Sequence, residues 1–174
     1  MKVKLLVAIA LLLLVACAAL GGMQEREKVY GKEVPIITES FASKQVTTGE
    51  NWRVYINASD PDGDMDQVVC YVDFQAGLLQ PYPISNTKVG KDQQKNLSGY
   101  LFLDTSGLLR PISIVLIVQI KDKAGHFSAP VSLSVNIGEP SQKQKEIRQE
   151  NPPRDIFQDK NLGPILIALT SEVG

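Results

Sequence analysis

The sequence predicts an all-β protein, a small antiparallel β-sandwich of about seven strands. Short segments in which apolar and polar residues alternate recur throughout residues 34–138, and clusters of Gly, Pro and Asp separate them. From Val34 onwards, no ten-residue stretch has a clear helical repeat before the far C-terminus. Several short strands separated by turns are typical of two packed antiparallel sheets.

The expected strands follow one another along the chain, each with an apolar face. In the second strand Trp52, Val54, Ile56 and Ala58 share a face, and in the third Cys70 lies among apolar neighbours. Prolines stand at the start of the last two strands, where the missing N–H is tolerated. The segments are 35–43, 51–59, 67–75, 82–90, 97–105, 112–122 and 131–137.

Length and composition are those of one globular domain with tails. The chain has 174 residues, of which 44% are hydrophobic and 21% charged, and its formal net charge is -1. Because there is no surplus of basic residues, we do not expect a nucleic acid as partner.

Residues 1–16 have the layout of a secretory signal. Lys2 and Lys4 form a positive start, and the apolar run from Leu5 to Ala16 is shorter than the ~20 residues of a membrane-spanning helix. We therefore expect the protein to be exported.

The end of this run, Leu14-Val15-Ala16-Cys17, resembles the bacterial lipobox. The resemblance implies a lipoprotein whose first mature residue, Cys17, carries lipid such as palmitate and anchors the chain to the membrane. Ala18 follows the cysteine, which implies the outer membrane in bacteria that sort by this position. Two alternatives remain: Ala16-Cys17-Ala18 also fits an A-x-A cleavage site, and the segment can stay uncut as an anchor.

Residues 17–33 then form a polar tether between the membrane and the domain, because they mix charge with glycine and lack an apolar repeat. A lipidated Cys17 leaves Cys70 without a partner for an internal disulfide. We expect Cys70 to be a core residue.

Two motifs resemble those of bacterial immunoglobulin-like domains of the cadherin-like, PKD-like and fibronectin-like group. They are "WRVYINASDPDGD", a strand followed by a turn, and "DKAGHFSAP", a hairpin before the closing strand. The resemblance covers residues 34–138 and implies an immunoglobulin-like sandwich. The chain lacks the Cys pair of immunoglobulins and the complete cadherin calcium motifs, so the resemblance alone does not imply a metal.

The aspartates around "DPDGD" have two interpretations. In this topology the loop after the second strand and the last hairpin lie at the same end, which brings together Asp60, Asp62, Asp64, Asp66 and Asp122. Clustered carboxylates suit Ca²⁺, which takes six to eight oxygen ligands. However, Asp, Pro and Gly are also the residues that a tight turn selects, and the spacing does not fit an EF-hand. Both a calcium site and a simple turn remain open.

The sequence contains no complete catalytic motif, and we expect a protein that is not an enzyme. His126 lies near Asp122 and Ser128, but residues crowded into one tight turn rarely adopt the geometry of a catalytic triad. An uncharacterised hydrolase remains a third hypothesis.

Residues 139–174 are expected to form a polar, flexible linker and a short apolar segment, 165–169. This segment is either an extra strand or helix folded back on the sandwich, or a tail that adds a strand to a partner's sheet.

These observations favour a noncatalytic lipoprotein of the cell envelope that acts as a binding or structural module, with a protein partner in the envelope. The alternative is calcium-dependent recognition of a carbohydrate by the loop end of the sandwich. Its stacking surface is expected among four aromatic residues, Tyr55, Tyr82, Tyr100 and Phe127.

Overall fold

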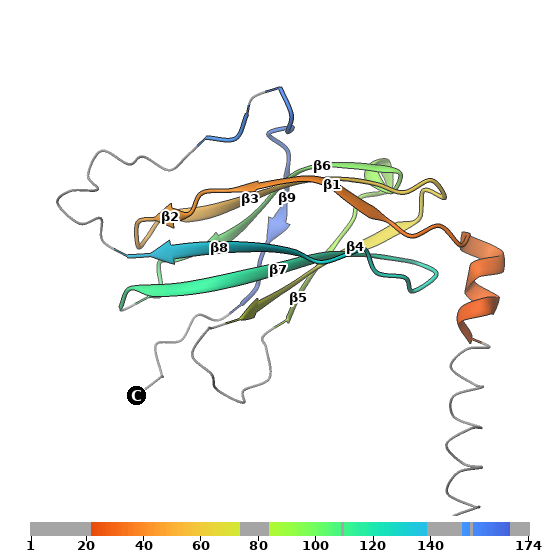
Figure 1. Cartoon of the computed structure of the whole chain (residues 1–174), viewed down its shortest axis with the longest axis horizontal. Coiled ribbons are helices and arrows are strands. Elements are labelled where there is room, and N and C mark those ends of the chain that lie inside the picture. Colours follow the sequence, from red (N-terminus) through yellow and green to blue (C-terminus); the bar gives the residue numbers. More distant parts are fainter. Residues whose placement is uncertain (1–21, 74–83, 109, 139–150, 154, 168–174) are drawn as a thin grey trace, which may run out of the picture.

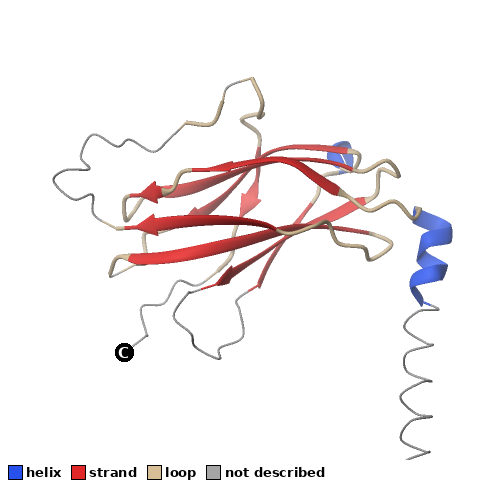
Figure 2. Cartoon of the chain, viewed as in Figure 1, coloured by secondary structure: helices blue, strands red, loops and turns tan. Residues whose placement is uncertain are grey.

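The structure is a computed structural model that describes residues 22–73, 84–108, 110–138, 151–153 and 155–167. Its strands form two sheets that face each other, as Figures 1 and 2 show. The all-β sandwich predicted from the sequence is thereby confirmed. Within the described ranges, no helix has both the length and the apolar composition needed to cross a membrane.

The first sheet has four strands in the order β1-β3-β6-β9, and the second has five in the order β2-β8-β7-β4-β5. Two pairings are parallel, β2 with β8 and β6 with β9, and the others are antiparallel. The strands are β1 (Ile36–Ala42), β2 (Gln45–Val46), β3 (Asn51–Ser59), β4 (Met65–Asp73), β5 (Ile84–Lys88), β6 (Asn96–Asp104), β7 (Ile112–Asp122), β8 (Val131–Ile137) and β9 (Asn161–Pro164). A short 3₁₀ helix, η1 (Lys91–Gln93), precedes β6.

The core lies between the two sheets and consists of the apolar faces expected from the alternation. On β3, Trp52, Val54, Ile56 and Ala58 are buried, and Cys70 is buried on β4. The indole Nε1 of Trp52 donates a hydrogen bond to the carbonyl oxygen of Ser43 at 2.8 Å, so its one polar group is satisfied. The prediction that Cys70 is a core residue is confirmed.

The segment before β1 differs from the expected tether. Residues 22–30 form a helix, which lies at one end of the sandwich in Figure 1. Sequence analysis missed it because the segment is polar and shows no apolar repeat.

The described part of the C-terminal tail also differs from a flexible linker. Residues 155–160 lead into β9, which lies beside β6, and Ile165 and Ile167 join the hydrophobic core. The described part of the expected apolar segment, residues 165–167, is thus folded back on the sandwich, but the extra strand itself comes just before it, at residues 161–164. Residues 139–150, 154 and 168–174 of the expected tail lie outside the described residues.

Candidate functional site

The aspartate loop connects β3 to β4 and is held by the backbone of two neighbouring loops. The N–H of Asp60 donates to the carbonyl oxygen of Lys95 at 3.0 Å, and the N–H of Lys123 donates to that of Asp64 at 3.2 Å. Gly63 has a φ of 73°, which suits glycine, and its N–H closes the turn onto the carbonyl oxygen of Asp60. The loop and the last hairpin therefore lie at the same end, as the topology predicted.

Two of the five aspartates, Asp60 and Asp64, are buried with incomplete hydrogen bonding. Their exposed fractions are 1% and 5%. Oδ1 of Asp60 accepts a hydrogen bond from the N–H of Asp62 at 3.1 Å. In contrast, Oδ2 of Asp60 and both carboxylate oxygens of Asp64 are buried without a hydrogen-bond partner. Such atoms are uncommon, because a buried polar group without a partner is costly.

The pKa of Asp60 is raised to about 6. Burial is the larger cause, and the neighbouring carboxyl group of Asp64 is the next. The backbone N–H groups of Asp62 and Asp64 act in the opposite direction but are the smaller influence. The carboxyl group of Asp60 therefore resists ionisation beside Asp64 in the absence of a neutralising partner.

The other three predicted ligands have different partners. Asp62 Oδ2 accepts from the N–H of Glu33 at 2.8 Å, and Asp66 forms an ion pair with Lys88 at 2.5 Å. Asp122 accepts hydrogen bonds from the backbone N–H groups of its own hairpin. Among the described residues, no three His, Cys, Asp or Glu side chains are arranged to hold a metal ion. The expected set of five is thus divided, and Asp60 and Asp64 form a separate pair.

His126 lies between two carboxylates. Its Nδ1 is 2.8 Å from Asp122 Oδ2, and its Nε2 is 3.2 Å from Glu27 Oε1 in the N-terminal helix. Burial lowers the pKa of His126, but the hydrogen bonds to Glu27 and Asp122 outweigh it, and the pKa is raised overall. Both ring nitrogens are therefore occupied.

Ser128 does not complete a triad with His126 and Asp122. It is buried, its hydroxyl donates to the carbonyl oxygen of Ala129 at 3.0 Å, and its Oγ accepts from the N–H of Ile120 at 2.9 Å. These contacts stabilise the β7–β8 hairpin. They give the hydrolase hypothesis no nucleophile at this position.

Helix 22–30 packs against this same end of the sandwich. Besides the contact between Glu27 and His126, the ammonium group of Lys123 lies 6.0 Å from the ring centre of Tyr30. The bond from Glu33 to Asp62 continues the contact beyond the helix. The N-terminal segment is therefore docked on the aspartate loop and the last hairpin, which its sequence alone did not indicate.

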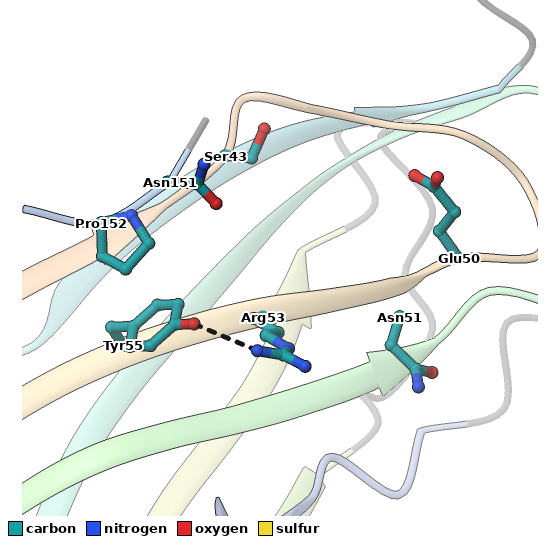
Figure 3. Close-up of a pocket in the computed structure, with 7 residues that line it drawn as sticks. All are labelled: Ser43, Glu50, Asn51, Arg53, Tyr55, Asn151 and Pro152. Carbon is teal, nitrogen blue, oxygen red and sulfur yellow. Dashed lines mark hydrogen bonds between the residues drawn. The ribbon is translucent and has the colours of Figure 1, made fainter. Parts of the chain in front are cut away.

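A polar cavity of about 310 Å³ lies at the other end of β3, shown in Figure 3. Arg53 and Tyr55 project into it from β3, and Nη1 of Arg53 is 3.5 Å from the hydroxyl of Tyr55. Arg53 also forms an ion pair with Asp159 at 3.4 Å. The lining residues are Ser43, Glu50, Asn51, Arg53, Tyr55, Asn151 and Pro152. Sequence analysis missed this cavity, because its walls come from two distant parts of the chain, residues 43–55 and 151–152.

Two of the four candidate stacking residues come together, but not at the loop end. The rings of Tyr55 and Tyr100 lie 5.4 Å apart on neighbouring strands, and Phe157 covers Tyr55 at 5.8 Å. Tyr55 is buried, so its ring is not an open stacking surface. Phe127 contacts Lys121 instead, and Tyr82 lies outside the described residues.

Of the two cysteines, only Cys70 is among the described residues. Cys17, the predicted lipidation residue, lies outside the described residues. Cys70 is buried, and burial raises the pKa of its thiol to about 12. A thiol with so high a pKa stays protonated and is a poor nucleophile.

The fold and its loop end thus define a β-sandwich protein with a docked N-terminal helix. No protein-family model and no curated protein matches the chain. Among solved structures, it is similar to a β-glucosidase from Listeria innocua in complex with glucose, with 13% identity and a TM-score of 0.37. The match covers 63% of this chain but spans only 17% of the glucosidase.

Proposed function

We propose that the chain is an exported lipoprotein that acts, without catalysis, as a binding or structural module of the cell envelope. The observation that carries this proposal is the docking of helix 22–30 on the loop end of the sandwich. Only residues 18–21 separate this helix from Cys17. While the helix is docked, a lipid on Cys17 would therefore hold the domain close to the membrane rather than on a long tether.

A lipid at this position would place the two ends of the sandwich at different distances from the bilayer. The loop end, which carries the helix (Figure 1), would be nearest to the bilayer, whereas the cavity beside Arg53 is lined by residues from the start of β3. A site for a soluble or envelope-bound partner is best placed on the side away from the lipid. The arrangement supports a binding role for the cavity end.

The proposal is tested by labelling the full chain in a bacterial host with an alkyne fatty acid, followed by membrane fractionation. We expect the wild type and Cys70→Ala to be labelled and to remain in the membrane fraction. Cys17→Ala should lose both the label and the membrane association, because it removes the acceptor thiol. Labelling that survives in Cys17→Ala would refute the lipid anchor.

Carbohydrate recognition is a second candidate function, favoured by the chemistry of the cavity. Its guanidinium, amide and hydroxyl groups are of the kind that orient a polar ligand by hydrogen bonds. Since the cavity is remote from the aspartate loop, a sugar site and a calcium site would be separate.

A panel of defined neutral and acidic oligosaccharides tests this second function. We expect one class to bind the wild type and to bind Arg53→Gln at least tenfold more weakly, with Lys91→Gln as the control for loss of a positive charge elsewhere. Binding that is unchanged in Arg53→Gln would place the sugar site outside this cavity.

A further inference from the structure

The turn between β3 and β4 explains only part of the aspartate loop. Its geometry uses Gly63 in a left-handed conformation and Oδ1 of Asp60, which accepts the N–H of Asp62. The carboxylate of Asp64 takes no part in that turn, because no backbone N–H donates to either of its oxygens, and the group beside it is the carboxyl of Asp60. A residue needed only to form a turn would not bury a carboxylate in this way.

The pair also lacks a cationic partner from the protein. Within the described part of the chain, no Lys, Arg or His forms an ion pair with Asp60 or Asp64. Lys123, whose backbone N–H bonds the carbonyl oxygen of Asp64, donates its side-chain ammonium to Gln94 Oε1 at 2.9 Å. The negative charge at this point is therefore not balanced by the side chains around it.

Two backbone carbonyl groups of the segment before β6 lie against the backbone of the aspartate loop and the first residue of β4. The carbonyl oxygens of Gln94 and Lys95 each accept a hydrogen bond from the aspartate loop, and each retains a second lone pair. Carboxylates and backbone carbonyls on converging loops are the oxygen ligands that hard divalent cations select. Neither a sulfur nor an imidazole ligand is part of the pair, so a soft metal is disfavoured.

We propose that Asp60 and Asp64 bind one divalent cation, Ca²⁺ in preference to softer metals, at the loop end of the sandwich. The ion supplies the partner that three buried carboxylate oxygens lack. It joins the β3–β4 loop to the segment before β6 and is independent of the lipid anchor and of the cavity beside Arg53. Water completes the coordination, which places the affinity in the range of extracellular calcium modules, about 10⁻⁴ to 10⁻³ M.

The loop itself provides matched controls. Asp62 and Asp66 lie in the same acidic stretch, but each already has a partner, in the N–H of Glu33 and in Lys88. Replacing either one with Asn removes the same charge from the same region. General electrostatic attraction of Ca²⁺ to an acidic loop would be weakened by all of these substitutions alike, whereas a built site depends on Asp60 and Asp64.

The experiment uses the full chain, purified in detergent, treated with EDTA and dialysed to pH 7.5. Titration calorimetry with CaCl₂ should show one binding event, and 5 mM Ca²⁺ should raise the melting temperature by about 3–10 °C. Asp64→Asn should bind at least tenfold more weakly and lose the thermal shift. Asp66→Asn and Asp62→Asn should bind within threefold of the wild type.

Several results would overturn the proposal. The first is a wild type that shows neither binding heat nor a thermal shift with Ca²⁺. In that case we expect Asp64→Asn to melt higher than the wild type at every Ca²⁺ concentration, because it removes a buried charge that no ion neutralises. A second is an equal loss of affinity in Asp64→Asn and Asp66→Asn, which would show attraction to acidic surface only. Should Asp60→Asn fail to fold, because Asp60 also forms the turn, Asp64→Asn alone decides the question.

Discussion

The segments before and after the sandwich differ in how they are attached to it. The N-terminal helix is held by polar contacts such as Glu27 with His126, and its Val29 is 73% exposed. The C-terminal segment instead places Ile165 and Ile167 in the hydrophobic core, at 3% and 8% exposure. The comparison teaches that polar contacts make the N-terminal segment a reversible attachment, whereas buried apolar side chains make the C-terminal segment part of the fold.

Energetics explain the difference. Full burial of an isoleucine side chain contributes roughly 1.5–3 kcal/mol, whereas a single hydrogen bond contributes about 0.5–1.5 kcal/mol net. The helix is therefore expected to detach locally while the sandwich stays folded, and β9 is expected to unfold only together with the sheets.

The largest expected effect is that of Ile165→Ala. Removing a buried side chain leaves a cavity between β6 and the core, and we expect the free energy of unfolding to fall by about 2–4 kcal/mol. Urea denaturation followed by the fluorescence of Trp52 measures it. Leu166→Ala is the control, because that side chain is 73% exposed and its loss should change stability by less than about 0.5 kcal/mol. Equal effects of the two substitutions would show that the tail is not part of the core.

The second largest effect on stability is expected at Gly99 of β6, where β9 packs closely against the strand. A Cβ atom at Gly99 would lie 2.4 Å from the carbonyl oxygen of Lys160, a backbone atom that cannot give way cheaply. We expect Gly99→Ala to destabilise the protein by about 1–3 kcal/mol. The control is Gly107→Ala, since nothing lies within 4 Å of a Cβ placed there. A Gly99→Ala variant as stable as the control would mean that β9 is not held against β6.

A smaller effect is expected at the other segment, for Glu27→Gln. The change removes the charge that faces His126 and should weaken docking of the helix by about 0.5–1 kcal/mol, with no change in the melting temperature of the sandwich. Hydrogen exchange of residues 22–33 measures the docking. The matched control, Glu25→Gln, changes an exposed residue of the same helix. Exchange that is the same in both variants would argue against docking through His126.

The sandwich was predictable from the sequence because apolar and polar residues alternate along most of every long strand. On β3 and β7 the inward positions, such as Ile56 and Leu116, are apolar except for Asp122 at the end of β7, so burial follows largely from the pattern. The parallel pairing of β9 with β6 was not predictable, since four residues carry too little pattern to identify a partner strand. The helix was missed because long-range contacts stabilise it rather than a local apolar face.

The candidate site was predictable only in outline. Topology correctly placed the aspartate loop and the last hairpin at one end. It did not indicate which carboxylates would find donors, because that depends on where backbone N–H groups point. Asp122 faces the N–H groups of Gly125 and His126, while Asp64 faces none. The division between satisfied and unsatisfied aspartates is therefore information that only the structure provides.

The smallest effect is a pH dependence of the N-terminal attachment, which arises from His126. The pKa of His126 is raised above its usual value near 6.5, because Glu27 of the helix and Asp122 of β7 stabilise the protonated ring. Arg26 of the helix also lies against the hairpin, with Nη2 3.3 Å from where a Cβ of Gly125 would lie. A raised pKa in the docked state means that docking is strongest below the pKa of the undocked histidine and weakens as pH rises through the raised value.

Hydrogen exchange of residues 22–33 measures this pH dependence. After correction for intrinsic rates, the exchange should increase with pH across that range in the wild type and change less in His126→Gln. If the two profiles have the same slope, protonated His126 does not hold the helix, and the contact with Glu27 is a neutral hydrogen bond.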